Sequence, residues 1–444
     1  MQARGAAALL VAFALLRGLV VAAVIPPLQG VDEPAHFDYA QRLAESRALP
    51  LLGRDRLEFS PEVREAARQL LGGIAFHPER KPPLLTTVAL PDPRLPASRF
   101  TDGQGPAATY PPLYYAAAAL SYRVIPESPL FARIRAARLV SIVLGALAAL
   151  LVLFGAHRLL GDWRAALAVA AIYSLQAQLA FLFAVVNNDA ALFAATAGAL
   201  FSIAALYRSP SSRGALAGLA LAALAGALSK PTLLLHLPAL GLLALVALGY
   251  LRPLSWLRAA LALAPAAICG LAWTLWRGTP LSPATPRHIS LANYLGDYVL
   301  ASRHVRFVWH DLYWMGWGWH DVWLWRPWYW LLAILLLAAL LSAVFSWRHL
   351  SPLERGILSA GAMASALSLF ALHATELAML RRGGGSLLQG RYLLPLFPVH
   401  AAMLVVALRG AGRVFKLRLQ AEWAGPVVLG AVLVASVARA LARY

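Results

Sequence analysis

The composition of the 444-residue chain excludes a soluble globular domain. Hydrophobic residues make up 60% of the chain and charged residues only 13%, and the mean hydropathy is +0.65, values typical of a membrane protein. The formal charge of +19 comes from arginines placed between apolar runs, which is a topology signal and predicts a lipid bilayer and no nucleic acid as partner. The single cysteine, Cys269, excludes an intramolecular disulfide and a Cys-based metal site.

Apolar segments of about 20 residues can cross a bilayer as helices. Their number predicts an all-α polytopic membrane protein, a bundle of 11–12 transmembrane helices in a single domain over residues 1–444. The first segment has no small-residue cleavage pattern after it and is expected to stay as the first span. The candidate segments are residues 6–25, 111–125, 139–155, 165–186, 190–207, 216–228, 232–250, 259–276, 328–345, 357–372, 392–408 and 426–441.

Basic residues in alternate connections predict the orientation, because cytoplasmic loops carry an excess of Lys and Arg. These residues are Arg208 and Arg213, Arg252 and Arg258, Arg348 and Arg355, and Arg409, Arg413, Lys416 and Arg418. The intervening connections are then extracytoplasmic, namely 26–110, 187–189, 229–231, 277–327 and 373–391, whereas 123–138 faces inward. Two apolar segments lie between Arg138 and Asp189 where this parity allows one crossing, so one of them is expected to be re-entrant or partial.

The densest polar chemistry follows the first apolar segment, in QGVDEPAHFDYAQRL at 29–43. A helix is predicted to begin at Glu33, with Asp32 at the N-cap and Pro34 in the first turn. Asp32, His36 and Tyr39 share a face of this helix, opposite an apolar stripe. The plain alternative is a solvated N-cap acid on an interfacial helix. The rest of the long 26–110 loop is expected to carry further short interfacial helices, including one at 61–71.

Other polar residues fall on the same predicted outer side, where ionisable groups at membrane depth usually face a cavity. They are Asn187, Asn188 and Asp189 at a helix junction, Lys230 after an apolar run, and Gln389 with Arg391. Lys230 is one of three lysines and runs against the positive-inside trend. It either snorkels to the interface or binds a phosphate, and the two readings stand about equal.

An ordered set of motifs gives the sequence a family resemblance. The motifs are GVDEPAHFDYAQ at 30–41, YPPLYY at 110–115, VVNNDA at 185–190, SKP at 229–231, WMGWGWHDVWLW at 314–325 and QGRYLLP at 389–395. The chain resembles the GT-C superfamily of membrane glycosyltransferases and, within it, a bacterial membrane-protein family marked by a DEPxHF signature. The resemblance covers nearly the whole chain and says nothing about the sugar.

The resemblance implies a hexosyl- or pentosyltransferase that takes a sugar from a polyprenyl-phosphate donor and passes it to a glycan, lipid or protein acceptor of the cell envelope. The reaction would take place on the outer face of the cell inner (cytoplasmic) membrane. The implied catalytic residues are Asp32, Glu33 and Asp189. The implied substrate-binding residues are His36, Tyr39, Asn187, Asn188, Lys230, Gln389 and Arg391. If a divalent metal takes part, Asp32, Glu33 and His36 are its candidate ligands.

The residue types suit this chemistry. A sugar phosphate already has a good leaving group, so the enzyme needs a base near the acceptor hydroxyl and cations near the departing phosphate. Asp32 suits the first role, and Lys230 and Arg391 suit the second. The tryptophans of 309–330 form either an interfacial aromatic belt, the commoner case, or a platform for sugar rings.

The serious alternative from another class is a transporter or flippase for lipid-linked glycans. Transporters place ionisable groups near the bilayer midplane and often show internal symmetry. Here the polar residues gather on one side and no repeat is visible. A metalloprotease is disfavoured because the ExxH spacing of Glu33 and His36 occurs once and no HExxH is present.

Overall fold

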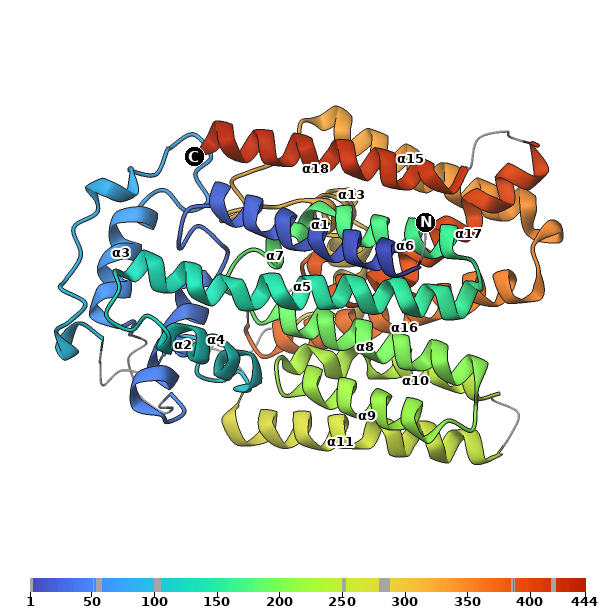
Figure 1. Cartoon of the computed structure of the whole chain (residues 1–444), viewed down its shortest axis with the longest axis horizontal. Coiled ribbons are helices and arrows are strands. Elements are labelled where there is room, and N and C mark those ends of the chain that lie inside the picture. Colours follow the sequence, from blue (N-terminus) through green and yellow to red (C-terminus); the bar gives the residue numbers. More distant parts are fainter. Residues whose placement is uncertain are drawn as a thin grey trace.

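The computed structural model contains long helices that run side by side, with the loops gathered at the two ends of the bundle (Figure 1). The structure describes residues 3–50, 52, 58–99, 105–249, 253–278, 288–384, 386, 388–416 and 421–444. Apolar segments become helices in a membrane because the helix satisfies every backbone N–H and C=O group within the segment.

Eighteen α-helices lie in these residues: α1 (Ala3–Val24), α2 (Glu33–Ser46), α3 (Pro61–Leu71), α4 (Leu113–Arg123), α5 (Leu130–Leu160), α6 (Trp163–Leu175), α7 (Ala177–Leu182), α8 (Asp189–Arg208), α9 (Arg213–Ala227), α10 (Leu237–Leu248), α11 (Pro253–Arg277), α12 (Leu291–Tyr294), α13 (Ser302–His304), α14 (Leu312–Trp314), α15 (Arg326–Ser346), α16 (Pro352–Arg381), α17 (Phe397–Val414) and α18 (Ala424–Arg443). Short 3-10 or π segments are η1 (Leu85–Thr87), η2 (Pro96–Ser98), η3 (Pro231–His236), η4 (Leu295–Leu300), η5 (Val305–Asp311), η6 (Trp347–His349), η7 (Gly390–Leu396) and η8 (Ala421–Trp423). The predicted all-α architecture is confirmed, and the helices expected from Glu33 and over 61–71 are present as α2 and α3.

Nine helical segments of the described residues are long and apolar enough to cross a membrane, and α6 and α9 are shorter apolar helices that run beside them (Figure 1). The segment predicted at 111–125 is not one of them. It forms only the 11-residue α4, which packs on α2 and α5. The apolar stretch 165–186 is broken at Gln176 into α6 and the six-residue α7.

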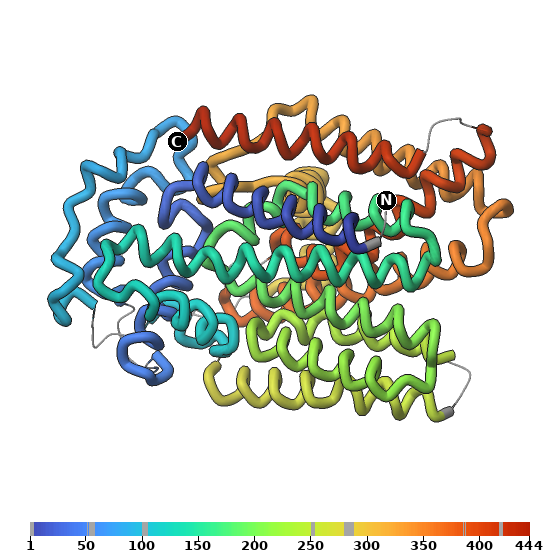
Figure 2. The backbone as a smooth tube through the Cα atoms, in the orientation of Figure 1, coloured from blue at the N-terminus to red at the C-terminus, as the bar shows by residue number. Residues whose placement is uncertain are grey.

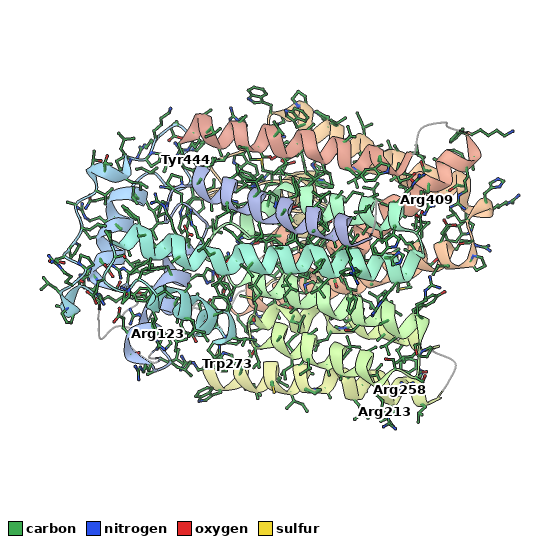
Figure 3. The ribbon with its side chains drawn as sticks, viewed as in Figure 1. Arg123, Arg213, Arg258, Trp273, Arg409 and Tyr444 are labelled. Carbon is green, nitrogen blue, oxygen red and sulfur yellow. The ribbon has the colours of Figure 1, made fainter. Side chains whose placement is uncertain are left out.

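One end of the bundle, here called the polar end, carries α2, α3, α4 and Tyr444 (Figures 1 and 3). The tube in Figure 2 shows the long first loop running around this end. Arg213, Arg258 and Arg409 lie at the opposite end (Figure 3). The basic connections therefore share one end, as the sequence predicted; Arg252 and Arg418 fall outside the described residues.

The connection 123–138 lies at the polar end, so its predicted inward orientation, opposite to the 26–110 loop, is wrong. Arg123 donates a hydrogen bond to the carbonyl of Ala44 in α2 at 3.0 Å. Arg133 forms a buried ion pair with Glu62 of α3 at 2.5 Å. The error arose because 111–125 was counted as a crossing, whereas it forms only the 11-residue α4. Without this crossing, parity allows the two helices α5 and α6 between Arg138 and Asp189.

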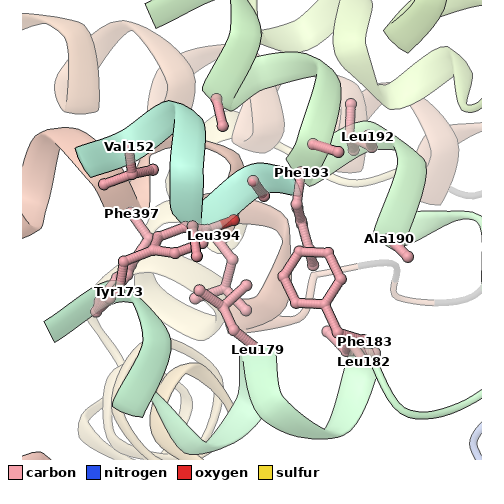
Figure 4. Packing of buried hydrophobic residues seen from close by; sticks show 14 of the residues in the cluster. Val152, Tyr173, Leu179, Leu182, Phe183, Ala190, Leu192, Phe193, Leu394 and Phe397 are labelled. Carbon is pink, nitrogen blue, oxygen red and sulfur yellow. The ribbon is translucent and has the colours of Figure 1, made fainter. Parts of the chain in front are cut away.

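Small residues let the helices of the bundle approach closely, as is common in membrane helix packing. An added Cβ at Gly155 of α5 would lie 3.3 Å from the backbone of Phe201 in α8. Aromatic rings fill the core below the turn that precedes α8 (Figure 4). Phe183 packs against Phe193 with ring centroids 5.9 Å apart and against Tyr173 at 6.5 Å. This aromatic packing supports the turn that precedes α8.

The revised topology makes a labelling prediction. In a Cys269→Ala background, Glu127→Cys should react with a membrane-impermeant maleimide from the same side as Asp92→Cys, because both exposed side chains lie in segments at the polar end. Ser211→Cys, in the connection before α9, should react only after the membrane is permeabilised. Labelling of Glu127→Cys together with Ser211→Cys would contradict the arrangement.

Candidate active site

Four charged residues that are far apart in sequence come together at the polar end. Each lies at or near the start of a helical segment. Asp32 precedes α2, Asp189 begins α8, Lys230 precedes η3 and Arg391 lies in η7. The Nζ atom of Lys230 lies 2.6 Å from Oδ1 of Asp189, and a terminal nitrogen of Arg391 lies 3.5 Å from Oδ2 of Asp32. The Tyr392 ring joins the two pairs, because Lys230 lies 5.7 Å and the Arg391 guanidinium 5.6 Å from its centre.

Asp32 occupies the N-cap position of α2, yet its carboxylate makes no capping hydrogen bond. Its backbone is left-handed, with φ 62° and ψ 3°, a conformation that costs energy for most residues and that Asp and Asn tolerate best. The side chain is 49% exposed. Asp32 therefore lies at the N-cap, half-exposed, without capping the helix, and its carboxylate is free to contact other groups.

Lys230 and Asp189 form an ion pair in which both side chains are almost fully buried. Lys230 also lies 6.0 Å from the centre of the Tyr110 ring. This burial is inconsistent with a lysine that snorkels to the interface, because a snorkelling ammonium group ends in water. Only one of its three donors is used by Asp189, so the ammonium group retains capacity to bind an anion.

Several buried polar atoms of the cluster have no hydrogen-bond partner among the described residues: Asn188 Oδ1, Asp189 Oδ2, Gln389 Oε1 and Arg391 Nε. Leaving such atoms unpaired is costly, and native proteins normally avoid it unless a ligand or water completes them. Three of the four are acceptors, which suit the hydroxyl groups of a sugar. The fourth is a cationic donor, which suits a phosphate oxygen.

His36 and a group of tyrosines form one wall of the site. The Nδ1 atom of His36 lies 2.7 Å from the Tyr115 hydroxyl, and its ring lies 5.8 Å from that of Tyr110. Burial lowers the pKa of His36 to about 4, although the neighbouring Asp32 opposes this shift. The imidazole is therefore neutral at pH 7 and can act as a hydrogen-bond partner without adding charge.

Two further predicted residues, Tyr39 and Asn187, contact other residues of the site and hold them in position. Tyr39 stacks on Tyr115 with ring centroids 3.9 Å apart and donates to the carbonyl of Tyr110 at 3.1 Å. Asn187 accepts a hydrogen bond from the backbone N–H of Asp189 at 2.8 Å. Both contacts shape the wall and the start of α8.

Glu33 points away from the cluster, into the protein. Its carboxylate forms a two-point ion pair with Arg138 of α5, with both N–O distances at 2.7 Å, and it also accepts the backbone N–H groups of Leu28 at 2.8 Å and Val186 at 2.9 Å. Glu33 is fully buried. In this geometry Glu33 positions the segments around Leu28 and Val186, whereas the sequence predicted a catalytic role for it beside Asp32.

The predicted metal ligands do not form a ligand set. Glu33 faces Arg138, whereas Asp32 and His36 face the site. Within the described ranges, no group of three or more His, Cys, Asp or Glu residues is arranged to hold a metal ion. The residues present therefore do not fit a protein-bound divalent cation at this position.

Residues 15–400 match the family described as "Predicted membrane protein (DUF2142)". The chain belongs to this DUF2142 family. No protein of curated description matches it. Among solved structures, it is similar to ArnT from Cupriavidus metallidurans bound to undecaprenyl phosphate, with a TM-score of 0.50 and 14% identity over 98% of this chain.

The chain spans 64% of the length of the ArnT chain. At this identity the likeness shows the fold alone. The DUF2142 chain is thus a multi-pass membrane protein with a GT-C-like helical bundle.

Sequence reasoning missed several residues of the site. Tyr110 and Tyr115 lie in the YPPLYY motif, and Tyr392 follows Arg391, but tyrosines near a membrane surface are too common to single out. His320 was missed as well. His320 follows Trp319 in a Gly-rich segment of the chain. It was overlooked because the surrounding tryptophans were interpreted as an interfacial aromatic belt.

The buried pair of Glu33 and Arg138 makes a stability prediction. Arg138→Ala should lower the free energy of unfolding by about 3–5 kcal/mol, because it leaves Glu33 as an uncompensated buried charge. Arg94→Ala, which removes an exposed pair with Asp92, is the control and should change the stability by less than about 1 kcal/mol. Denaturant unfolding in detergent would measure both, and equal effects would contradict the positioning role.

Proposed function

We propose that this DUF2142 protein is a GT-C-type glycosyltransferase. It moves a hexose or pentose from a polyprenyl-phosphate donor to a glycan, lipid or protein acceptor of the cell envelope. The reaction takes place on the outer face of the cytoplasmic membrane. The observation that carries the proposal is one half-exposed carboxylate, Asp32, beside two buried cations, Lys230 and Arg391. The GT-C-like fold supports the same reading.

Lys230 and Arg391 suit the donor phosphate. A phosphate leaving a sugar gains charge in the transition state, and fixed cations in a region drier than bulk water stabilise that charge more than exposed ones do. Lysine supplies a compact charge and arginine a planar fork, so the two can contact different oxygens of one phosphate. A phosphate would also complete the unpaired Nε atom of Arg391.

Asp32 suits the acceptor side. In the proposed step, the acceptor hydroxyl oxygen forms a bond to the anomeric carbon while its proton passes to the Asp32 carboxylate. The bond between the anomeric carbon and the phosphate oxygen breaks, and its electron pair leaves with the polyprenyl phosphate. One such displacement inverts the anomeric centre. The step is routed through no metal ion, because the residues present do not form a ligand set.

Asp189 acts through Lys230 in this account. Its carboxylate fixes the ammonium group from one side, which leaves the remaining donors of Lys230 for the phosphate. Asn188, Gln389 and the free oxygen of Asp189 offer acceptors to the sugar hydroxyls. His36 contributes a neutral hydrogen-bonding group on the same wall.

The role of Asp32 is tested by Asp32→Asn. Asparagine keeps the size and tolerates the left-handed backbone, but it removes the base, so transfer should slow by about 100- to 10,000-fold. The measurement is transfer of radiolabelled sugar from a panel of polyprenyl-phosphate sugars in membranes containing the purified variant. Asp297→Asn, which changes an exposed acid of η4, should transfer at the wild-type rate. Wild-type activity of folded Asp32→Asn would refute the assignment.

A further inference from the structure

The turn Trp317–Val322, which follows η5 and α14, is fixed rigidly over the start of α2. Trp317 and Val322 pair through backbone hydrogen bonds of 3.2 and 3.3 Å. The Trp317 indole is fully buried and donates to the carbonyl of Ala177 at 3.0 Å. Asp321 forms a buried ion pair with Arg443 of α18 at 2.9 Å. Contacts to α7 and α18 therefore hold the turn from both sides.

The turn is also tied to the segment that leads into Asp32. The Trp319 indole donates to the carbonyl of Leu28 at 3.1 Å. The Phe76 ring meets the Trp319 ring edge-on at 5.6 Å and lies 6.3 Å from the His320 ring. Phe76 is 59% exposed, so part of its ring is accessible to a ligand.

Several residues with a strained backbone lie around the turn Trp317–Val322. Six non-glycine residues of the described chain have left-handed φ values, and four of them are Leu28 (68°), Asp32 (62°), Phe76 (65°) and His320 (57°). Such conformations cost free energy and persist where the surrounding structure enforces them, often at functional sites. The four residues come from three separate segments, so local sequence does not explain their gathering.

His320 is poised for a ligand. Its Nδ1 atom is buried and has no hydrogen-bond partner among the described residues. Burial lowers the pKa of His320 to about 4, helped by Arg391 and opposed by Asp32. Its ring is thus neutral at pH 7. Asp32 and Arg391 are thus near enough to His320 to influence its pKa.

We propose that Phe76, Trp319 and His320 form the acceptor subsite and that its occupant is a saccharide. Aromatic faces pack against the C–H faces of a sugar ring, while a neutral imidazole bonds its hydroxyls and brings one of them to Asp32. The proposal rests on the proposed function, because it assumes that Lys230 and Arg391 hold the donor phosphate.

A lipid acceptor fits the surroundings less well. Two apolar cavities lie elsewhere in the bundle, one lined mainly by α5, α8, α10, α16 and α17, and the other by α15, α16, α17 and the η5–α14 segment. The surface beside His320 instead combines the exposed Phe76 ring and the half-buried Trp319 ring with a carboxylate and an imidazole. That mixture is suited to a ligand with both C–H faces and hydroxyl groups.

The experiment uses the full chain in lipid nanodiscs and a panel of lipid-free oligosaccharides from bacterial envelopes, with binding measured by saturation-transfer NMR. At least one saccharide should bind the wild-type protein. Trp319→Ala and His320→Gly should weaken this binding by ten-fold or more. His320→Asn, which tolerates the left-handed backbone and keeps a hydrogen-bonding group, should restore part of it. Trp325→Ala is the control, because Trp325 is an exposed tryptophan at the start of α15, and should bind as wild type does.

A stability measurement separates binding from structure. His320→Gly should melt at or above the wild-type Tm, because glycine adopts a positive φ without strain. A merely structural histidine would instead lower Tm when it is removed.

Binding of undecaprenyl phosphate is followed in parallel. Wild-type protein that binds undecaprenyl phosphate but no saccharide, or variants that bind saccharide as the wild type does, would overturn the acceptor subsite alone. Wild-type protein that does not bind undecaprenyl phosphate would overturn the proposed function as well.

Discussion

The ion pair between Glu33 and Arg138 is the interaction on which the polar end depends. Arg138 donates to the carbonyls of Ala22, Ile25 and Pro26 as well as to Glu33, and Glu33 accepts from the turn that precedes α8. One pair thus joins the end of α1, the start of α2, the outer part of α5 and the approach to Asp189. Burying two charges is expensive unless every remaining hydrogen bond is satisfied, and here the surrounding backbone groups supply those bonds.

This anchoring explains how adjacent acids come to differ. With Glu33 fixed inward, the peptide before it turns left-handed and Asp32 is directed outward. The same constraint places Asp32 opposite Arg391, and the Tyr392 ring contacts both Arg391 and Lys230. The four charged groups of the site, two cations and two carboxylates, then compensate one another in the absence of a ligand. A singly charged phosphodiester would add one negative charge to this balance, and the half-exposed Asp32 carboxylate can remain solvated while the phosphate binds the two cations. The phosphate oxygens and the sugar hydroxyls match the unpaired atoms that line the site.

Much of the arrangement could be predicted from the sequence. Hydropathy indicated a polytopic helical protein, and the costliness of intramembrane charge singled out Asp32, Asp189, Lys230 and Arg391, which the structure brings together. The pair of Glu33 with Arg138 could not be predicted, because local sequence does not reveal a partner 105 residues away. The orientation of 123–138 was wrong because hydropathy does not distinguish the 11-residue α4 from a crossing helix. The role proposed for His320 depends on its strained backbone and on its contact with Phe76, which only the folded chain supplies.

The central claim is that Lys230 and Arg391 bind the donor phosphate, and binding of undecaprenyl phosphate to purified variants tests it most directly. Lys230→Ala and Arg391→Ala should weaken binding by about ten- to hundred-fold, as loss of a charge-assisted hydrogen bond typically does. Arg391→Lys should recover only part of the loss, because the planar fork is gone. Lys81→Ala, an exposed lysine of the first loop, should bind as wild type does.

Because Lys230→Ala strands the buried Asp189 carboxylate, the double variant Asp189→Asn/Lys230→Gln serves as a folded, neutral comparison and should bind as weakly. Undecaprenyl phosphate affinity equal to wild type in folded Lys230 and Arg391 variants would contradict the account.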